Sequence, residues 1–181
     1  MSSKEYCLYS GGLKGAEETF GNCAQEYGIN EINFSFEGHT VARDKNITIL
    51  SDDELKKGNI SMEIVSERMG RRYAKGNKIR KVFQLIFHMV NKGYQVIAIG
   101  WIQEDKTVKG GTGWGVELAK FFNRPVHVFD QTTDQWYAWK NSEWVEDLPM
   151  ITNKTFCGTG TRNLSESGRK AIKDLFSRSF S

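Results

Sequence analysis

Apolar residues along this chain follow two alternating patterns, and each pattern predicts a different kind of element. Five short runs rich in apolar, β-branched and aromatic residues have the length of strands. The clearest is YQVIAIGW at 94–101, whose nearly continuous apolar character is typical of a parallel strand covered on both faces. The other four runs lie at residues 5–9, 29–38, 125–130 and 154–162.

Between these runs the apolar positions recur every three or four residues, which is the period of an amphipathic helix. The pattern predicts a first helix that ends at Gly28, and two helices within 61–91 that are broken near Gly76. Further helices are expected at 114–122 and 164–176. Because strands and helices alternate, we predict an α/β fold in which a mostly parallel sheet lies between layers of helices.

Two segments depart from this alternation, and we expect them to be insertions in a single domain that spans residues 1–181. Residues 39–60 are polar and lack clear periodicity, so they predict a long loop, within which SDDEL at 51–55 is suited to cap a short turn. Residues 132–148 contain two aromatic-rich arms around Lys-Asn-Ser, which is the pattern of a β-hairpin.

Composition and charge narrow the classes of partner. A net charge of +3 describes an ordinary globular protein, so we expect no nucleic-acid partner, and no apolar run is long enough to predict a membrane span. The densest basic run, Arg68 to Lys81, fits either a solvated helix face or a patch that faces phosphate. Three cysteines and three histidines show no metal-ligand spacing, so neither a metal nor a cofactor is expected. The odd cysteine count and the lack of a signal peptide favour a reducing, cytoplasmic location.

Three glycine-bearing loops each follow a predicted strand, at residues 10–15, 109–113 and 158–162. The carboxyl ends of parallel strands meet at one edge of a sheet, and ligands bind beyond that edge. We therefore expect the three loops to converge on one site. Any one of them is explained equally well by a tight turn that close packing requires, but three together favour a ligand.

The chemistry of these loops suits a phosphorylated ligand. GGTGWG opens a helix, and a glycine loop at a helix N-terminus exposes amides that bind phosphate. Glu117, one turn further on, either complements the helix dipole or faces the pocket, where it would bind a ribose hydroxyl or act as a general acid or base. Four aromatic residues either stack on a base or pack in the core: Trp114 and, in the hairpin, Trp136, Tyr137 and Trp139. The other predicted ligand-binding residues are Ser10, Gly11, Gly12, Lys14, Gly110, Gly111, Thr112, Gly113, Thr159 and Arg162.

The same loops carry a resemblance to known proteins. GGTGWGVELA resembles the PGGxGTxxE signature of the lonely-guy (LOG) phosphoribohydrolases, with Lys109 in place of the proline and Trp114 in place of the threonine. YSGGLKGAEETFGNCAQEYGI looks like the second strand-loop-helix unit of the YpsA and DNA-processing protein A families, which reads roughly SGGAxGxD. FCGTGTRNLSESGRKAIKDLF is similar to the first unit of those families. Because that unit stands last here, the chain resembles a circularly permuted YpsA-like member of the SLOG superfamily.

The resemblance implies a Rossmann-like three-layer sandwich that binds a nucleotide-derived small molecule, often as a homo-oligomer. It leaves two hypotheses open. One is a binding protein that captures its ligand, and the other is a nucleotide N-glycosidase in which Glu117 pairs with an arginine, by position Arg80, or else Arg71 or Arg72. The permuted pattern also resembles sequences of tailed phages, which would make the first hypothesis an anti-defence protein that sequesters a cyclic or linear nucleotide immune signal in the host cytoplasm. A structural or DNA-binding role is a third possibility.

Overall fold

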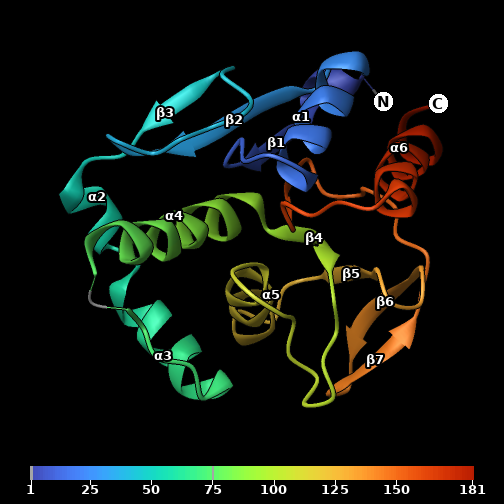
Figure 1. Cartoon of the computed structure of the whole chain (residues 1–181). Helices are drawn as coiled ribbons and strands as arrows, with labels where there is room; N and C mark the ends of the chain where they lie inside the picture. The colour runs from blue at the N-terminus through green and yellow to red at the C-terminus, as the bar shows by residue number, and fades with distance from the viewer. Residues whose placement is uncertain (1, 75) are drawn as a thin grey trace.

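The computed structural model describes residues 2–74 and 76–181, and its eight strands join one sheet in the order β3-β2-β1-β8-β4-β5-β6-β7. Six neighbouring strands, from β3 to β5, run parallel, and the last two are antiparallel (Figure 1). The predicted mostly parallel α/β sandwich is therefore confirmed. The strands are β1 (Cys7–Ser10), β2 (Asn30–Ser35), β3 (Ile47–Ile49), β4 (Gln95–Gly100), β5 (Val126–Asp130), β6 (Gln135–Lys140), β7 (Glu143–Glu146) and β8 (Thr155–Gly160).

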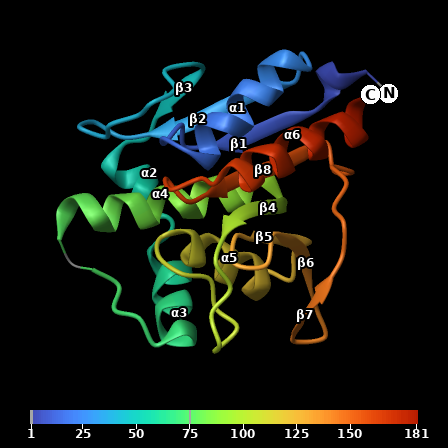
Figure 2. The same cartoon turned by 45° about the vertical axis from the view of Figure 1, so that its right-hand side comes forward.

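Helices cover both faces of this sheet (Figure 2). Helices α1 and α6 pack together on one face, while α3, α4 and α5 pack against one another on the other. None of the helices within the described residues is long and apolar enough to cross a membrane. The helices are α1 (Ala16–Glu26), α2 (Asp52–Lys56), α3 (Asn59–Met69), α4 (Asn77–Gly93), α5 (Thr112–Phe121) and α6 (Glu166–Phe180), and a short 3₁₀ helix spans Ser3–Glu5.

The central strands have apolar side chains on both faces because both faces are covered. Every residue of β4 is buried, and its side chains alternate between two clusters: Val96 and Ala98 lie in the core beneath α4 and α5, while Ile97 and Ile99 lie in the core beneath α1 and α6. The continuous apolar run at 94–101 is therefore explained by burial on two sides.

The expectation of a long loop at 39–60 is wrong in part. Ile47–Ile49 forms strand β3, which pairs in parallel with β2 at the sheet edge, and the segment continues into α2. An edge strand of three residues is too short to produce a recognisable alternation. The capping prediction is confirmed. The Ser51 hydroxyl accepts a hydrogen bond from the Glu54 amide, and the Glu54 carboxylate accepts one from the Ser51 amide.

The predicted hairpin is present, but it extends the main sheet. Strand β6 pairs antiparallel with β5, and a two-residue turn with positive φ at Asn141 and Ser142 leads into β7. Two of its aromatic side chains are partly buried, because Trp139 packs edge-on against Trp144 and both lie around the Lys120 ammonium.

The two ends of the described chain lie side by side in both views (Figures 1 and 2). The Tyr6 ring meets the Phe180 ring edge-on at 5.1 Å, and strand β1 pairs in parallel with β8. The last strand-helix unit of the chain thus lies directly beside the first.

Candidate functional site

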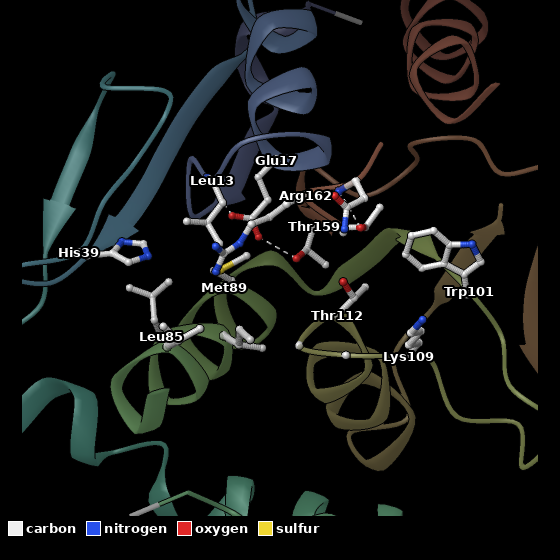
Figure 3. Close-up of a pocket in the computed structure, with 17 residues that line it drawn as sticks. Leu13, Glu17, His39, Leu85, Met89, Trp101, Lys109, Thr112, Thr159 and Arg162 are labelled. Atoms are coloured by element: carbon white, nitrogen blue, oxygen red, sulfur yellow. Dashed lines mark hydrogen bonds between the residues drawn. The ribbon is translucent and has the colours of Figure 1, made fainter. Parts of the chain in front are cut away.

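A cavity of about 350 Å³ opens at the carboxyl ends of β1, β8 and β4. Its lining includes residues from all three glycine-bearing loops: Leu13 from the first, 109–112 from the second and 159–162 from the third (Figure 3). The predicted convergence is therefore confirmed. The cavity lies where the chain turns toward β2 on one side and toward β5 on the other, as expected of a doubly wound sheet.

The cavity has an apolar wall and a polar rim. Helix α4 supplies the wall through four side chains on one of its faces, and Trp101 lies near the opposite end. On the rim are two cationic side chains, Lys109 and Arg162. A flat apolar group and an anionic group would thus find different parts of the same cavity. The four α4 residues are Val82, Leu85, Ile86 and Met89.

The amides of the β1–α1 loop are already engaged by a carboxylate of the chain itself. Glu17, in the first turn of α1, accepts hydrogen bonds from the Leu13 amide at 3.2 Å, the Gly11 amide and the Thr159 hydroxyl at 2.8 Å. The predicted phosphate contact with Gly11 and Gly12 therefore needs correction, because the Gly11 amide is engaged by Glu17 and neither glycine lines the cavity.

Glu17 is almost completely buried, and it lines the cavity. Burial raises the pKa of its carboxyl group, while the hydrogen bonds from Thr159, Leu13 and Gly11 and the charge of Arg162 act in the opposite direction. Figure 3 shows Glu17, Thr159 and Arg162 grouped on one side of the cavity, with Thr112 and Lys109 across from them.

The first and third loops are pressed against each other. A Cβ added to Gly15 would lie 2.6 Å from the Thr161 carbonyl oxygen and 2.8 Å from the Arg162 Cα, and the Ala16 amide donates to that same oxygen. This contact holds Arg162 at the rim, where its side chain is exposed and makes no ion pair with any residue in the described part of the chain. Its guanidinium remains available for an anion.

The loop before α5 differs because its glycines face open space. A Cβ added to Gly110 or Gly111 would meet nothing within 4 Å. Within residues 2–74 and 76–181, the amides of Gly111 and Thr112 have no hydrogen-bond acceptor, as expected for the first turn of a helix. Lys109 completes a cluster of donors at this end of the cavity.

Arg71 holds this loop from behind. Its guanidinium donates to the carbonyl oxygens of Val108 at 2.8 Å and Gly110 at 3.1 Å. Gly113 is required by the same contact, since a Cβ there would lie 1.9 Å from the Val108 oxygen and 2.7 Å from an Arg71 nitrogen. Gly113 therefore serves packing rather than ligand contact.

His39 brings an unpartnered polar atom to the cavity. Its ring stacks on Phe36 with centroids 4.6 Å apart, and its Nδ1 lies 2.9 Å from the Ser35 hydroxyl. Its Nε2 is buried and has no hydrogen-bond partner among the described residues. Burial, together with the charges of Lys78 and Arg162, lowers the pKa of this imidazole. The neutral ring therefore offers one polar atom to a ligand.

Glu117 and Trp114, which were predicted to contact the ligand beside the second loop, point away from the cavity, Glu117 toward α3 and Trp114 toward α4. The carboxylate of Glu117 is buried between Arg68 and Lys120, each at 3.2 Å. The arginine that pairs with Glu117 is therefore Arg68 on α3, and not Arg80 or its predicted alternatives, Arg71 and Arg72. Trp114 stacks on Phe83 with ring centroids 4.1 Å apart, so the core-packing alternative is correct for it.

Four further predicted residues also lie outside the cavity lining. Trp136 on β6 is buried against Phe129, on the α1 and α6 face of the sheet, so it cannot stack on a ligand in this cavity. Arg80 lines a different hollow, between α2 and α4. Ser10 is buried and donates to the Gly158 carbonyl at 2.7 Å, and Lys14 is exposed.

Sequence reasoning missed Glu17 and His39. A signal for Glu17 was present, because it stands at the aspartate position of the SGGAxGxD pattern that its segment resembles. His39 carried no comparable signal, since it lies in a polar stretch without periodicity and reaches the cavity only through the folding of that segment.

The chain was compared with protein-family models, curated proteins and solved structures, and none of the three comparisons found a match. Functional inference for this cavity therefore depends on its own geometry.

Proposed function

We propose that the protein binds a nucleotide-derived small molecule in the cavity at the carboxyl ends of β1, β8 and β4. The observation that carries the proposal is the uncommitted donor cluster at the start of α5. The free amides of Gly111 and Thr112 lie in the cavity lining, and Figure 3 shows Thr112 across the cavity from Arg162, which makes no ion pair with the described residues. An anion with several oxygen atoms satisfies such donors at little entropic cost, because they are held in place before binding.

We propose positions for the parts of the ligand from the residues that line the rest of the cavity. The phosphate would lie on Gly111 and Thr112, with Lys109 and Arg162 on either side. The base would pack on the apolar face of α4, in place of the hairpin aromatics predicted from sequence. Glu17 and His39 would then form hydrogen bonds with the sugar or with the polar edge of the base. A volume of about 350 Å³ is at the low end for small-molecule cavities, which favours a ligand with one base.

The N-glycosidase hypothesis now depends on a different residue. Glu117 is neutralised by Arg68 and Lys120, so it offers no free carboxylate to a ligand. Glu17 is the carboxylate at the cavity, and it is held by three donors from the loops. Because those hydrogen bonds give Glu17 a sufficient structural role, we favour capture of the ligand over turnover.

The order of the loops supports the predicted superfamily. A circular permutation needs the first and last strand-helix units to be neighbours, and here β1 pairs directly with β8. Membership of the SLOG superfamily, a phage origin and a homo-oligomeric state remain predictions. Exposed Val145, Leu148 and Met150 near the hairpin are the apolar residues that an oligomer would cover.

The test is incubation with nucleotides followed by product analysis. Purified protein is mixed with a panel of nucleoside mono-, di- and triphosphates and cyclic dinucleotides, and binding is followed by calorimetry. The protein is then denatured, and the released molecules are identified by chromatography. We expect one class of nucleotide to bind and to be recovered intact.

Matched variants separate the possible outcomes. Arg162→Gln should weaken binding by about tenfold or more, because it removes a charge-assisted contact, whereas Arg169→Gln on α6 changes the net charge equally but lies outside the cavity lining. Release of free base that disappears in Glu17→Gln would replace capture by hydrolysis. Failure of every nucleotide to bind would contradict the proposed function.

A further inference from the structure

A second hollow, of about 260 Å³, lies between α2, α3 and the first half of α4. Cationic side chains outnumber carboxylates in its lining by three to one, and the remaining lining groups are amides. The first cavity is lined by different residues of α4, so the two are separate sites. The lining residues of the second hollow are Asp52, Lys56, Asn59, Asn77, Arg80, Lys81 and Gln84.

Arg80 is held firmly in this hollow without being neutralised. Its guanidinium lies over the Tyr73 ring, 3.9 Å from the centroid, and its Nη2 donates to the Asn59 side-chain oxygen at 3.3 Å. The carboxylate nearest to it is Glu63 at 3.8 Å, whose side chain is 57% exposed. Because the Glu63 carboxylate is exposed and lies at the limit of ion-pair distance, water screens it, and it offsets little of the arginine charge.

The acceptors that hold Arg80 are distant or shared. Its Nη1 donates to the Ala74 carbonyl at 3.5 Å, and its Nη2 shares the Asn59 side-chain oxygen with other donors. The Asn59 side-chain oxygen accepts from the Tyr73 hydroxyl at 2.8 Å, from the Gln84 amide at 2.8 Å and from Arg80. A carbonyl oxygen has two lone pairs, so three donors compete for it. Gln84 is buried and lines the hollow, and its amide nitrogen donates to Asn59 with one of its two N–H groups, which leaves the second for another acceptor. A bound anion would supply the missing acceptors.

The mouth of the hollow adds two ammonium groups. Lys81 pairs with Asp52 at 3.2 Å, but the Asp52 side chain is 71% exposed, so the pair can open toward another anion at small cost. Lys56, on α2, adds a further positive charge from the opposite side.

We propose that this hollow is a second binding site, for an oxyanion of the phosphate class carried by a small phosphorylated molecule. Arg80 presents the planar donor pair that binds two oxygens of a phosphate, Gln84 contacts it from the buried side, and Lys81 and Lys56 close over it. The site is independent of nucleotide binding in the first cavity.

The test is an NMR titration of ¹⁵N-labelled protein with inorganic phosphate. We expect the side-chain amide signals of Gln84 and Asn59 to shift in a saturable manner. Arg80→Gln should lower the affinity measured at these two signals by about tenfold or more, since one charge-assisted pair of hydrogen bonds is lost. Lys57→Gln is the control, because Lys57 neighbours Lys56 in sequence but lies outside the lining.

Since Arg80 also joins α3 to α4, Lys81→Gln at the exposed mouth provides a second variant that should fold normally and still weaken binding. Phosphate that shifts only the amides of Gly111 and Thr112 would overturn the proposal, because those signals report the first cavity. An equal loss of affinity in Lys57→Gln would overturn it as well, because the effect would then come from net charge alone.

Discussion

The two glycine loops at the first cavity look alike in sequence but differ in what surrounds their glycines. In the loop between β1 and α1, Gly12 and Gly15 are buried, have positive φ, and have backbone atoms within 3 Å of any added Cβ. In the loop before α5, Gly110 also has positive φ, but Gly110 and Gly111 are exposed and have nothing within 4 Å of an added Cβ.

Their amides differ in the same way. The amides of Gly11 and Leu13 donate to Glu17, whereas those of Gly111 and Thr112 have no acceptor among the described residues. The first loop therefore carries its own anion, and the second is left for an anion from outside. Glycine density does not distinguish the two cases, because glycine is used both where another segment comes close to the backbone, as at Gly15, and where φ is positive in open space, as at Gly110.

The largest expected difference between the two loops is in stability, when the arginine that packs against each loop, Arg43 or Arg71, is replaced. Arg43 is buried, forms a two-contact ion pair with Glu31, and its amide donates to the Gly12 carbonyl. Arg43→Met should lower the free energy of unfolding by about 3–5 kcal/mol, since it leaves Glu31 as an unpaired buried charge. Arg71→Met behind the second loop should cost only about 1–2 kcal/mol, because Arg71 is half-buried. Urea denaturation measures both, and equal losses would contradict the contrast.

A smaller loss of stability is expected from Gly15→Ala. The new methyl group would lie within 2.8 Å of backbone atoms of Thr161 and Arg162, at a residue whose φ is +94°. Left-handed backbone and overpacking together should cost about 2–4 kcal/mol. The matched variant is Gly111→Ala, which should leave stability unchanged or raise it slightly, because φ there is −60° and the space is open. A stable Gly15→Ala protein would show that the first loop is not packed as described.

The smallest effect is a pH dependence that Glu17 imposes on the first loop. Burial raises its pKa above 4.5, its ordinary value, so the folded protein binds this proton more tightly than the unfolded chain. The stabilisation from protonated Glu17 is complete below pH 4.5 and is lost as the pH rises through the folded pKa. In a plot of unfolding free energy against pH, this loss appears as a fall in stability with rising pH. Glu17→Gln should remove that contribution to the slope. Identical slopes for both proteins would show that Glu17 titrates normally.

The layers, the sheet and the convergence of loops were predictable because each depends on local patterns. The apolar period of α4 and the continuous run of β4 determine which faces are buried, and the parallel order brings the loops to one edge. The three-residue strand β3 was not predictable, since so short an edge segment leaves no periodic signal. His39 was not predictable for a related reason, because it lies in the same aperiodic segment, ahead of this strand.

The side-chain assignments were harder to predict because direction depends on packing between distant elements. From the sequence, Glu117 was predicted to face the pocket, but its carboxylate instead forms ion pairs with Arg68 on α3 and Lys120 on α5. Trp114 and Trp136 are aromatic residues near loops, yet each is buried with another aromatic ring. Only the partners of these side chains distinguish core packing from ligand contact, and those partners lie far away in the sequence.

The most direct test of the account compares ligand affinity and stability in one variant, Gly111→Leu. The nucleotide that binds the unaltered protein most tightly is titrated into the variant by calorimetry, and urea unfolding of the ligand-free variant is measured alongside. The account predicts an unfolding midpoint close to that of the parent protein and a loss of affinity of at least about 100-fold, because the leucine side chain would enter the space assigned to phosphate. Undiminished affinity in the folded variant would contradict it.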